Sequence, residues 1–210
     1  MKVELIDYMG NDDSVVTAAR ASFAKEASNY TDEQNHRLIR YLAEHKHLSP
    51  FYHTTVTLRL KAPIAIHAQM MKHTVGFAHN TTSRRYVTSE PELFIPEFRE
   101  KAPNVKQGSL DTEHLDNKEF KGRYKQLCNS AINYYEFLIS QGVPAEQARF
   151  ILPQGVMTEW VSTGSLYAWV RFYNLRTDPH AQKEIQDLAH MVGEIIEPLY
   201  PHSWKALVRS

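Results

Sequence analysis

The sequence predicts a mixed α+β fold. Segments with the alternating pattern of strands are interspersed with segments of helical periodicity, and no regular strand-helix-strand rhythm links them. The length of 210 residues suits one ordinary domain or two small ones. No repeat divides the chain, and we interpret residues 97–117, rich in charges and turn formers, as a surface excursion and not a boundary. We therefore expect one domain over residues 1–210.

Three segments are predicted to be strands because apolar and polar residues alternate along them. They are residues 1–9, 53–61 and 156–162. The alternation is strictest in residues 53–61, HTTVTLRLK, and Pro63 ends that strand.

Helices are predicted where capping residues precede apolar residues at helical spacing. Thr31 and Gln34, for example, form a capping-box pattern. Gly142 should end the longest helix as its left-handed cap, and Asp178 should cap the last one. The predicted helices follow the Asn11–Ser14 turn (carrying Val15, Val16, Ala18, Ala19 and Phe23), start at Thr31, and span 64–72, 117–140, 144–152, 165–175 and 178–196.

Periodicity fails between residues 73 and 89, where small, polar and basic residues replace it. We predict an ordered loop there and not a core element. We expect this loop to carry residues that take part in the protein's chemistry. In the short helix after Pro144, Ala148 and Ile151 should pack inward while Arg149 points elsewhere.

Composition excludes several classes of protein. With 24 basic and 24 acidic residues, the chain has no global positive field to hold nucleic acid. The single cysteine, Cys128, can form neither an intrachain disulfide nor a CxxC metal pair, which fits a reducing compartment. No stretch approaches the roughly 18 apolar residues of a membrane span. We expect a cytoplasmic protein that binds neither nucleic acid nor membrane.

The standard cofactor and metal motifs are absent from the sequence. It contains no GxGxxG, no GxxxxGK[ST], no HExxH and no GxSxG. His67, His73 and His79 recur every six residues, a spacing that does not place three imidazoles on one helical face. We therefore expect no metal site.

What remains is four polar segments, residues 47–53, 69–86, 147–153 and 172–186, of which the last three contain arginines. Hydroxyls, backbone N–H groups and guanidiniums are the donors that a phosphate monoester needs. Each segment also has a structural interpretation: a turn with incidental histidines, a solvated arginine pair, an arginine on a structural carboxylate, or Arg176 favoured by a helix C-terminus. Together they favour an anionic substrate over acyl transfer, because a covalent nucleophile is lacking.

These segments resemble the flavin-dependent thymidylate synthases, the ThyX family. That family's signature is Arg-His-Arg, seven or eight residues, then Ser-x-Arg; here it reads Lys72-His73-Thr74, eight residues, Ser83-Arg84-Arg85. The resemblance extends over nearly the whole chain and includes ARASF (19–23), HLSPF (47–51), KAPI (61–64), QARFILP (147–153) and NLRTDPHAQKEI (174–185). It implies a single-domain fold with a mixed or antiparallel sheet flanked by helices.

The resemblance also implies a homotetramer whose active sites lie between subunits, each with FAD stacked beside dUMP. Arg176 is the expected catalytic residue and faces the pyrimidine ring. The flavin-binding residues implied are Ser49, Lys72, His73, Thr74, Thr81, Ser165, Tyr167 and Arg171. The dUMP-binding residues implied are Gln69, Lys72, Ser83, Arg84, Arg85, Arg149 and Arg176.

The activity implied is synthesis of dTMP from dUMP, with methylenetetrahydrofolate as carbon donor and NADPH as reductant. Cys128 lies in an apolar helical pattern and is expected to be buried, so activation should come from the Arg176 charge and not from a thiolate. Lys72, Thr74 and Thr81 replace two arginines and a glutamate of the family, and Tyr52 replaces another glutamate. Two alternatives stay open: a dUMP or dCMP hydroxymethylase, and a non-catalytic relative that binds pyrimidine nucleotides.

Overall fold

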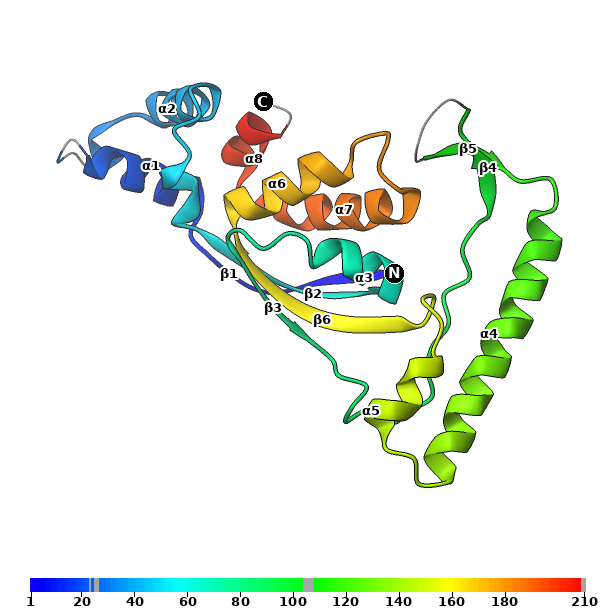
Figure 1. Ribbon diagram of the computed structural model, residues 1–210. Coiled ribbons are helices and arrows are strands. Elements are labelled where there is room, and N and C mark those ends of the chain that lie inside the picture. Colours follow the sequence, from blue (N-terminus) through cyan, green and yellow to red (C-terminus); the bar gives the residue numbers. More distant parts are fainter. Residues whose placement is uncertain (23, 25–26, 104–107, 209–210) are drawn as a thin grey trace. The chain divides into compact units, whose positions relative to one another are not determined.

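The computed structural model describes residues 1–22, 24, 27–103 and 108–208 (Figure 1). The elements are β1 (Lys2–Met9), α1 (Asp12–Ala21), η1 (Ala27–Asn29), α2 (Asp32–Glu44), η2 (Ser49–Tyr52), β2 (Thr55–Pro63), α3 (Ile64–Met70), β3 (Phe77–Thr81), β4 (Arg99–Lys101), β5 (Ser109–Glu113), α4 (Asn117–Ser140), α5 (Ala145–Ala148), η3 (Arg149–Ile151), β6 (Met157–Ser165), α6 (Leu166–Arg176), α7 (Lys183–Ile196), η4 (Glu197–Leu199) and α8 (Pro201–Leu207). The predicted α+β class is confirmed.

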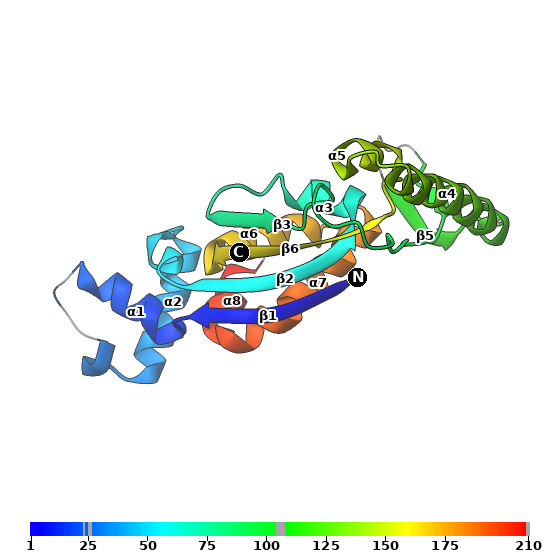
Figure 2. The same cartoon turned by 90° about the horizontal axis from the view of Figure 1, so that it is seen from below.

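A four-stranded sheet in the order β1-β2-β6-β3 forms the centre of the fold, and β4 pairs with β5 in a separate antiparallel ribbon. Figures 1 and 2 show α6 and α7 lying against one face of the sheet. Alternate residues of β2, namely Val56, Leu58 and Leu60, are fully buried. The strict alternation of this strand therefore places one of its faces in the core, as the sequence predicts.

The chain divides into two compact units, and strands β2 and β6 each run from one unit into the other. Unit 1 consists of Met1, residues 61–69 and residues 81–160. Unit 2 consists of residues 2–60, 70–80 and 161–210. In unit 1 the long helix α4 packs against α5 and η3, and in unit 2 α2 packs against α8 and α6 against α7.

Local hydrogen bonds explain why several helices begin where the sequence predicts. Asn11 and Ser14 form a reciprocal capping box at α1, and Thr31 and Gln34 form another at α2. The predicted bounds of α4, residues 117–140, are confirmed, and Gly142 follows it with φ +80°. Phe23, predicted to belong to the first helix, lies outside the described residues.

The predicted loop over residues 73–89 is wrong for its middle part. Phe77–Thr81 forms β3 at one end of the four-stranded sheet order. Its sequence, FAHNT, is too polar to indicate a core strand. A strand at the edge of a sheet buries only part of its surface, so a polar sequence can still form one. Gly76, at φ +79°, makes the turn before β3, and its carbonyl accepts the Ser165 N–H at the start of α6.

Two further expectations need correction, and one segment gains detail. Helix α7 begins at Lys183 and not near Asp178, whose carboxylate instead accepts the N–H of His180 in a turn. Ile151 does not pack inward, because 42% of its surface is exposed at the end of η3. Residues 97–117 hold the β4 and β5 ribbon, and residues 104–107 of this segment lie outside the described residues.

Helix α8 was not predicted, since its seven residues carry no strong periodic signal. No helix within the described ranges is both long and apolar enough to cross a membrane. A search of the same ranges finds no group of three or more histidine, cysteine or acidic side chains arranged to hold a metal ion.

Candidate functional site

Two cavities, one in each unit, gather most of the residues that the sequence singles out. The cavity in unit 1 has a volume of about 520 Å³. Its lining includes Thr81, Ser83, Arg84, Arg85 and Arg149, which come from the end of β3, the following turn and η3. The remaining lining residues are Ile64, His67, Thr82, Leu152 and Thr158. None of these described lining residues is acidic, so this cavity presents a cationic surface.

The three arginines of the unit 1 cavity each donate to a nearby oxygen atom, and Arg85 also lies over the Tyr86 ring, 5.1 Å from its centroid. Arg84 donates to the carbonyl oxygen of Ser89. The Nε of Arg85 donates to Ser83 Oγ at 3.3 Å, and the Nε of Arg149 donates to the Glu146 carbonyl at 3.3 Å. Within residues 1–22, 24, 27–103 and 108–208, no carboxylate forms an ion pair with any of the three. Three uncompensated guanidiniums suit a multiply charged anion such as a phosphate.

The same cavity also has a neutral, hydroxyl-rich side. His67 Nε2 lies 2.9 Å from Thr81 Oγ1, and the His67 ring meets the Trp160 ring edge-on with centroids 4.8 Å apart. Thr81 belongs to this cavity and not to the one in unit 2, although the family resemblance assigns it to the flavin. Hydroxyl and imidazole groups beside the guanidiniums can form neutral hydrogen bonds to a sugar.

The cavity in unit 2 has a volume of about 580 Å³ and a different character. Lys46 and Arg171 supply positive charge, while Tyr167 and His73 supply rings. Its other lining residues are Leu48, Val170, Asn174, Leu175 and Leu207. Tyr167 stacks edge-on against Tyr52 at a centroid distance of 5.4 Å. The cavity therefore combines an apolar and aromatic wall with two cations.

Arg176 reaches the unit 2 cavity through His73. Arg176 is the last residue of α6, as predicted, and its Nε donates to His73 Nε2 at 2.9 Å. The pKa of His73 is lowered from 6.5 to about 4, first by burial and then by the positive charges of Arg176 and Arg171. Burial also lowers the pKa of Arg176. His73 is therefore neutral at physiological pH.

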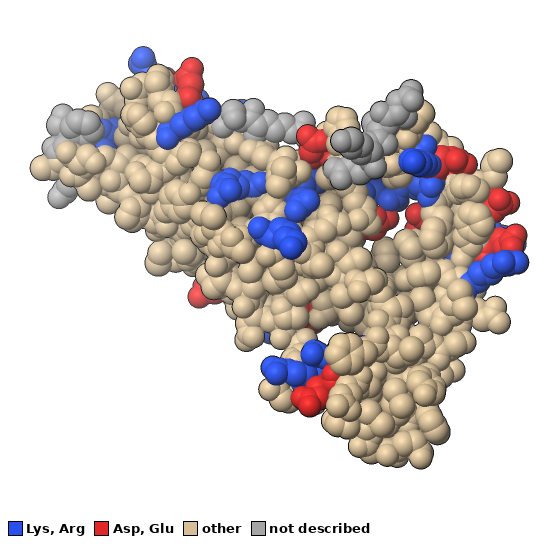
Figure 3. Space-filling view, viewed as in Figure 1, with Lys and Arg blue, Asp and Glu red and all other residues tan. Residues whose placement is uncertain are grey.

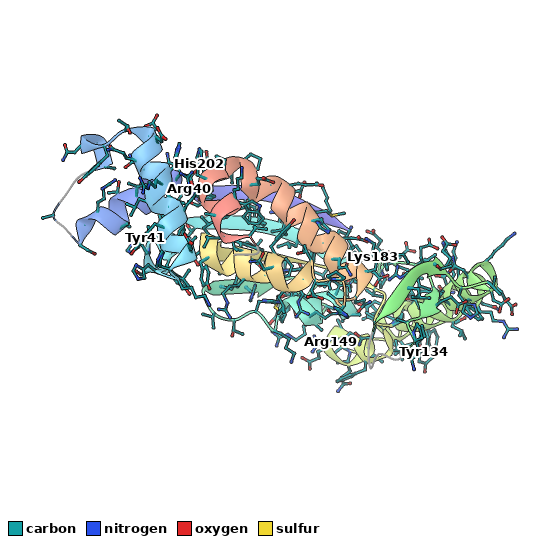
Figure 4. All side chains as sticks on the ribbon, turned by 90° about the horizontal axis from the view of Figure 1, so that it is seen from above. Arg40, Tyr41, Tyr134, Arg149, Lys183 and His202 are labelled. Carbon is teal, nitrogen blue, oxygen red and sulfur yellow. The ribbon has the colours of Figure 1, made fainter. Side chains whose placement is uncertain are left out.

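Figure 3 shows lysine and arginine side chains gathered over α6 and the turn before β3, with no acidic side chain between them. Figure 4 shows Arg149 at the outer edge of unit 1, beside the helix that carries Tyr134. The sequence leaves open whether Arg149 pairs with a structural carboxylate. Arg149 is exposed, and its Nε donates to a backbone carbonyl.

Six predicted residues are absent from the described lining of both cavities, and one of them is Arg176, which contacts the lining residue His73. Ser49, Lys72 and Thr74 are exposed in unit 2, and Gln69 is half-buried at the end of α3. Ser165 is buried, and its hydroxyl caps α6 by accepting the Ala168 N–H at 3.2 Å. The structure gives Ser165 a local role as a helix cap.

Cys128 is buried on α4, as predicted, with 5% of its surface exposed. Its neighbour Tyr124 has a pKa raised to about 12, first by burial and then by a hydrogen bond to Cys128. A buried thiol without a nearby cation lacks the setting of a nucleophile.

Lys46 and His67, which line the cavities, were not predicted as site residues from the sequence, and neither were His79 and Ser162, which are not among the described lining residues. His79 Nδ1 lies 2.7 Å from Ser162 Oγ, and His79 Nε2 lies 2.9 Å from the His73 carbonyl oxygen. The recurrence of His67, His73 and His79 every six residues is visible in the sequence. It does not indicate a metal site, but it does mark the two histidines, His73 and His79, that contact each other in the fold.

Comparison with known proteins shows which family the chain resembles over nearly its whole length. The family model described as "Thymidylate synthase complementing protein" matches residues 4–202. A flavin-dependent thymidylate synthase of Thermotoga neapolitana is 35% identical, over 99% of this chain and 90% of its own length. The enzyme of the same name from Thermosipho africanus is 34% identical over the same shares.

A solved structure shares the fold. It is the UMP/dUMP methylase PolB of Streptomyces cacaoi bound with 5-Br dUMP, and it superposes with a TM-score of 0.89. The two sequences are 28% identical, and the match covers 99% of this chain and 94% of PolB. A second structure of PolB, bound with 5-Br UMP, matches with a TM-score of 0.87 and 26% identity.

Proposed function

Because the chain belongs to the thymidylate synthase complementing protein family, we propose that it is a flavin-dependent thymidylate synthase that converts dUMP to dTMP. Methylenetetrahydrofolate donates the carbon and NADPH is the reductant. The observation that carries the proposal is the cavity of unit 1, where three arginines that pair with no carboxylate of the described residues line the same space as Ser83.

The unit 1 cavity supports binding of the dUMP phosphate. Ser83, Arg84 and Arg85 come from one turn, and Arg149 comes from more than sixty residues later in the chain. A phosphate accepts hydrogen bonds from all of these groups and neutralises their charges. Thr81 and His67 then lie where a nucleotide's sugar can follow its phosphate.

The unit 2 cavity fits a flavin nucleotide by its donor set. A flavin nucleotide needs an apolar wall for its ring system and cations for its phosphates. Tyr167 and Val170 supply the wall, Lys46 and Arg171 the charge, and the His73 ring can donate to a carbonyl edge. When bound, FAD supplies the reducing equivalents that turn a transferred one-carbon unit into a methyl group.

Arg176 activates the pyrimidine in this proposal. A guanidinium beside the N3 and carbonyl edge of the ring stabilises negative charge there, which raises the electron density at C5. No covalent addition is required, and this agrees with the burial of Cys128. The protein's part is to orient the ring and to supply a field.

The test is NADPH oxidation by the purified protein with added FAD, measured with and without dUMP and methylenetetrahydrofolate. The proposal expects oxidation that depends on both, together with formation of dTMP by mass spectrometry. A hydroxymethyl product would favour the hydroxymethylase, with dCMP tested in parallel. Nucleotide binding without any turnover, with FAD supplied in excess, would favour the non-catalytic relative.

A second substrate deserves the same assay. PolB is described as a UMP/dUMP methylase, and the neutral side of the unit 1 cavity holds hydroxyl and imidazole groups that can accept a ribose 2′-hydroxyl. Methylation of UMP at a rate comparable with dUMP would extend the proposed function to both sugars.

The assembly belongs to the same proposal. We propose that residues 1–210 form one domain. We also propose that four copies form a homotetramer whose active sites lie between subunits, and that the protein is cytoplasmic. Each subunit offers a phosphate-type cavity in unit 1 and a flavin-type cavity in unit 2. Sedimentation equilibrium gives the number of copies directly, and a monomer that turns over dUMP would refute the shared sites.

A further inference from the structure

Arg176 contacts a neutral imidazole through its Nε. Its Nε always carries a proton, so the His73 Nε2 that it reaches at 2.9 Å must be the acceptor. The proton of a neutral His73 is then on Nδ1. A neutral ring orients the guanidinium without adding a charge of its own.

His79 has the opposite proton arrangement. The His73 carbonyl oxygen can only accept, so the His79 Nε2 that lies 2.9 Å away must carry a proton. Its Nδ1 lies 2.7 Å from Ser162 Oγ, and Ser162 is fully buried. In neutral His79 the serine therefore donates to Nδ1.

These contacts join four separate segments of unit 2: β6 through Ser162, β3 through His79, the turn after α3 through His73, and the end of α6 through Arg176. Aromatic rings support both histidines. Phe77 stacks on His79 with centroids 5.3 Å apart, and Phe172 meets His73 edge-on at 5.1 Å. A long arginine side chain held in this way loses less conformational entropy when its ligand binds.

We propose that His79 and Ser162 are positioning residues for Arg176, acting through the backbone and ring of His73. The proposal rests on the proposed function for its catalytic consequence, but not for its geometry. His79 fixes the His73 backbone through the carbonyl, and the His73 ring fixes the guanidinium. Arg176 is thereby oriented before a pyrimidine arrives.

Nitrogen NMR of the holoprotein labelled with ¹⁵N in its histidine rings tests the geometry without any assay of turnover. The expected result is one ring protonated on Nδ1, whose signal disappears in His73→Gln, and one protonated on Nε2, whose signal disappears in His79→Gln. In Arg176→Lys the fixed tautomer of His73 should be lost, because lysine has no Nε donor. A His73 proton found on Nε2 in the wild type would overturn the proposal.

Kinetics of two variants test the consequence. His79→Phe keeps an aromatic ring beside Phe77 and loses both hydrogen bonds, so kcat with dUMP should fall about 10- to 100-fold while KM changes little. His79→Gln, whose amide can donate to the carbonyl and accept from Ser162, should restore most of the rate. Ser162→Ala, a smaller change, gives a milder loss and serves if His79→Phe does not fold.

The matched control is His36→Phe. His36 stacks on His202 with centroids 3.4 Å apart, where α2 meets α8 in the same unit (Figure 4). This variant should keep the wild-type kcat. Equal kcat in wild type, His79→Phe and Ser162→Ala would overturn the proposal. If no protein turns over dUMP, the proposed function fails, and the NMR tautomers alone decide whether His73 and His79 hold Arg176.

Discussion

The two units hold their arginines in different ways. In unit 1, Arg84 and Arg149 contact only backbone carbonyls, and Arg85 contacts a serine hydroxyl within its own turn. In unit 2, Arg176 donates to a histidine that is itself tied to a strand and to a buried serine. The first group is held locally, and the second is held by segments far apart in the sequence.

The difference matches what each group has to do. A phosphate carries enough charge to order several guanidiniums, so the unit 1 arginines do not need to be held in place before it binds. A neutral pyrimidine ring brings no such charge, and an arginine that stabilises charge during reaction must be oriented beforehand. Unit 1 should therefore govern affinity for the substrate, and unit 2 should govern the rate of its conversion.

The strongest test of this division is Arg176→Ala, which should lower kcat with dUMP by roughly 10²–10³ or more, since it removes the preorganised charge. Cys128→Ala, in unit 1, should keep most of the activity because the thiol is buried. Steady-state kinetics of both variants provide the measurement. The reverse pattern, with Cys128→Ala inactive, would refute activation without a thiolate.

The next largest effect is expected from Arg149→Ala, which should raise the KM for dUMP roughly 10- to 100-fold, the equivalent of one charge-assisted hydrogen bond. The value of kcat should change much less. Arg123→Ala is the matched control, because Arg123 is an exposed arginine of the same unit that pairs with Glu119 on α4. A fall in kcat with an unchanged KM would break the assignment of unit 1 to affinity.

The parts of the fold that the sequence predicts are those fixed by neighbours in the chain. The capping boxes at Asn11 and Thr31 depend on residues three positions away, and the β2 alternation repeats every two residues. Strand β3 escaped prediction because its polar sequence acquires a strand partner, β6, only in the folded chain. The start of α7 was misplaced because Asp178 forms a turn whose sequence resembles a cap.

The candidate site divides in the same way. Composition and spacing pointed to arginines in distant segments, and only the family resemblance indicated which of them share a ligand. The contact between His79 and Ser162 spans 83 residues, so no local pattern could reveal it. Long-range polar contacts of this kind depend on how the strands pair, which periodicity does not specify.

A third prediction concerns the flavin-type cavity itself. Arg171→Ala should weaken FAD binding about 10-fold, because it removes one of the two cations that line this cavity and could face a phosphate. Titration of flavin fluorescence measures the affinity. Lys183→Ala is the control, since Lys183 lies in the same unit and pairs with Asp187. An unchanged FAD affinity in Arg171→Ala would place the flavin phosphates elsewhere.

The smallest expected effect is on stability and concerns His73. Its pKa is lowered from 6.5 to about 4 in the folded protein, so between these values the unfolded chain binds a proton that the folded chain does not. Protonation therefore favours unfolding, and the free energy of unfolding falls as the pH drops from about 6.5 toward 4. The slope should stay well below the limit of about 1.4 kcal/mol per pH unit, because the ring is only half-buried.

His73→Gln isolates this contribution, because glutamine keeps an acceptor for Arg176 and does not titrate. Urea unfolding of both proteins at several pH values gives the difference, in which the shared carboxylates cancel. The wild type should lose stability relative to the variant as the pH falls below 6.5, and the two curves should run parallel above it. If the free energies of unfolding of the two proteins stayed parallel over the whole pH range, His73 would have the same pKa in the folded protein and in the unfolded chain. That result would contradict a neutral His73 in contact with Arg176.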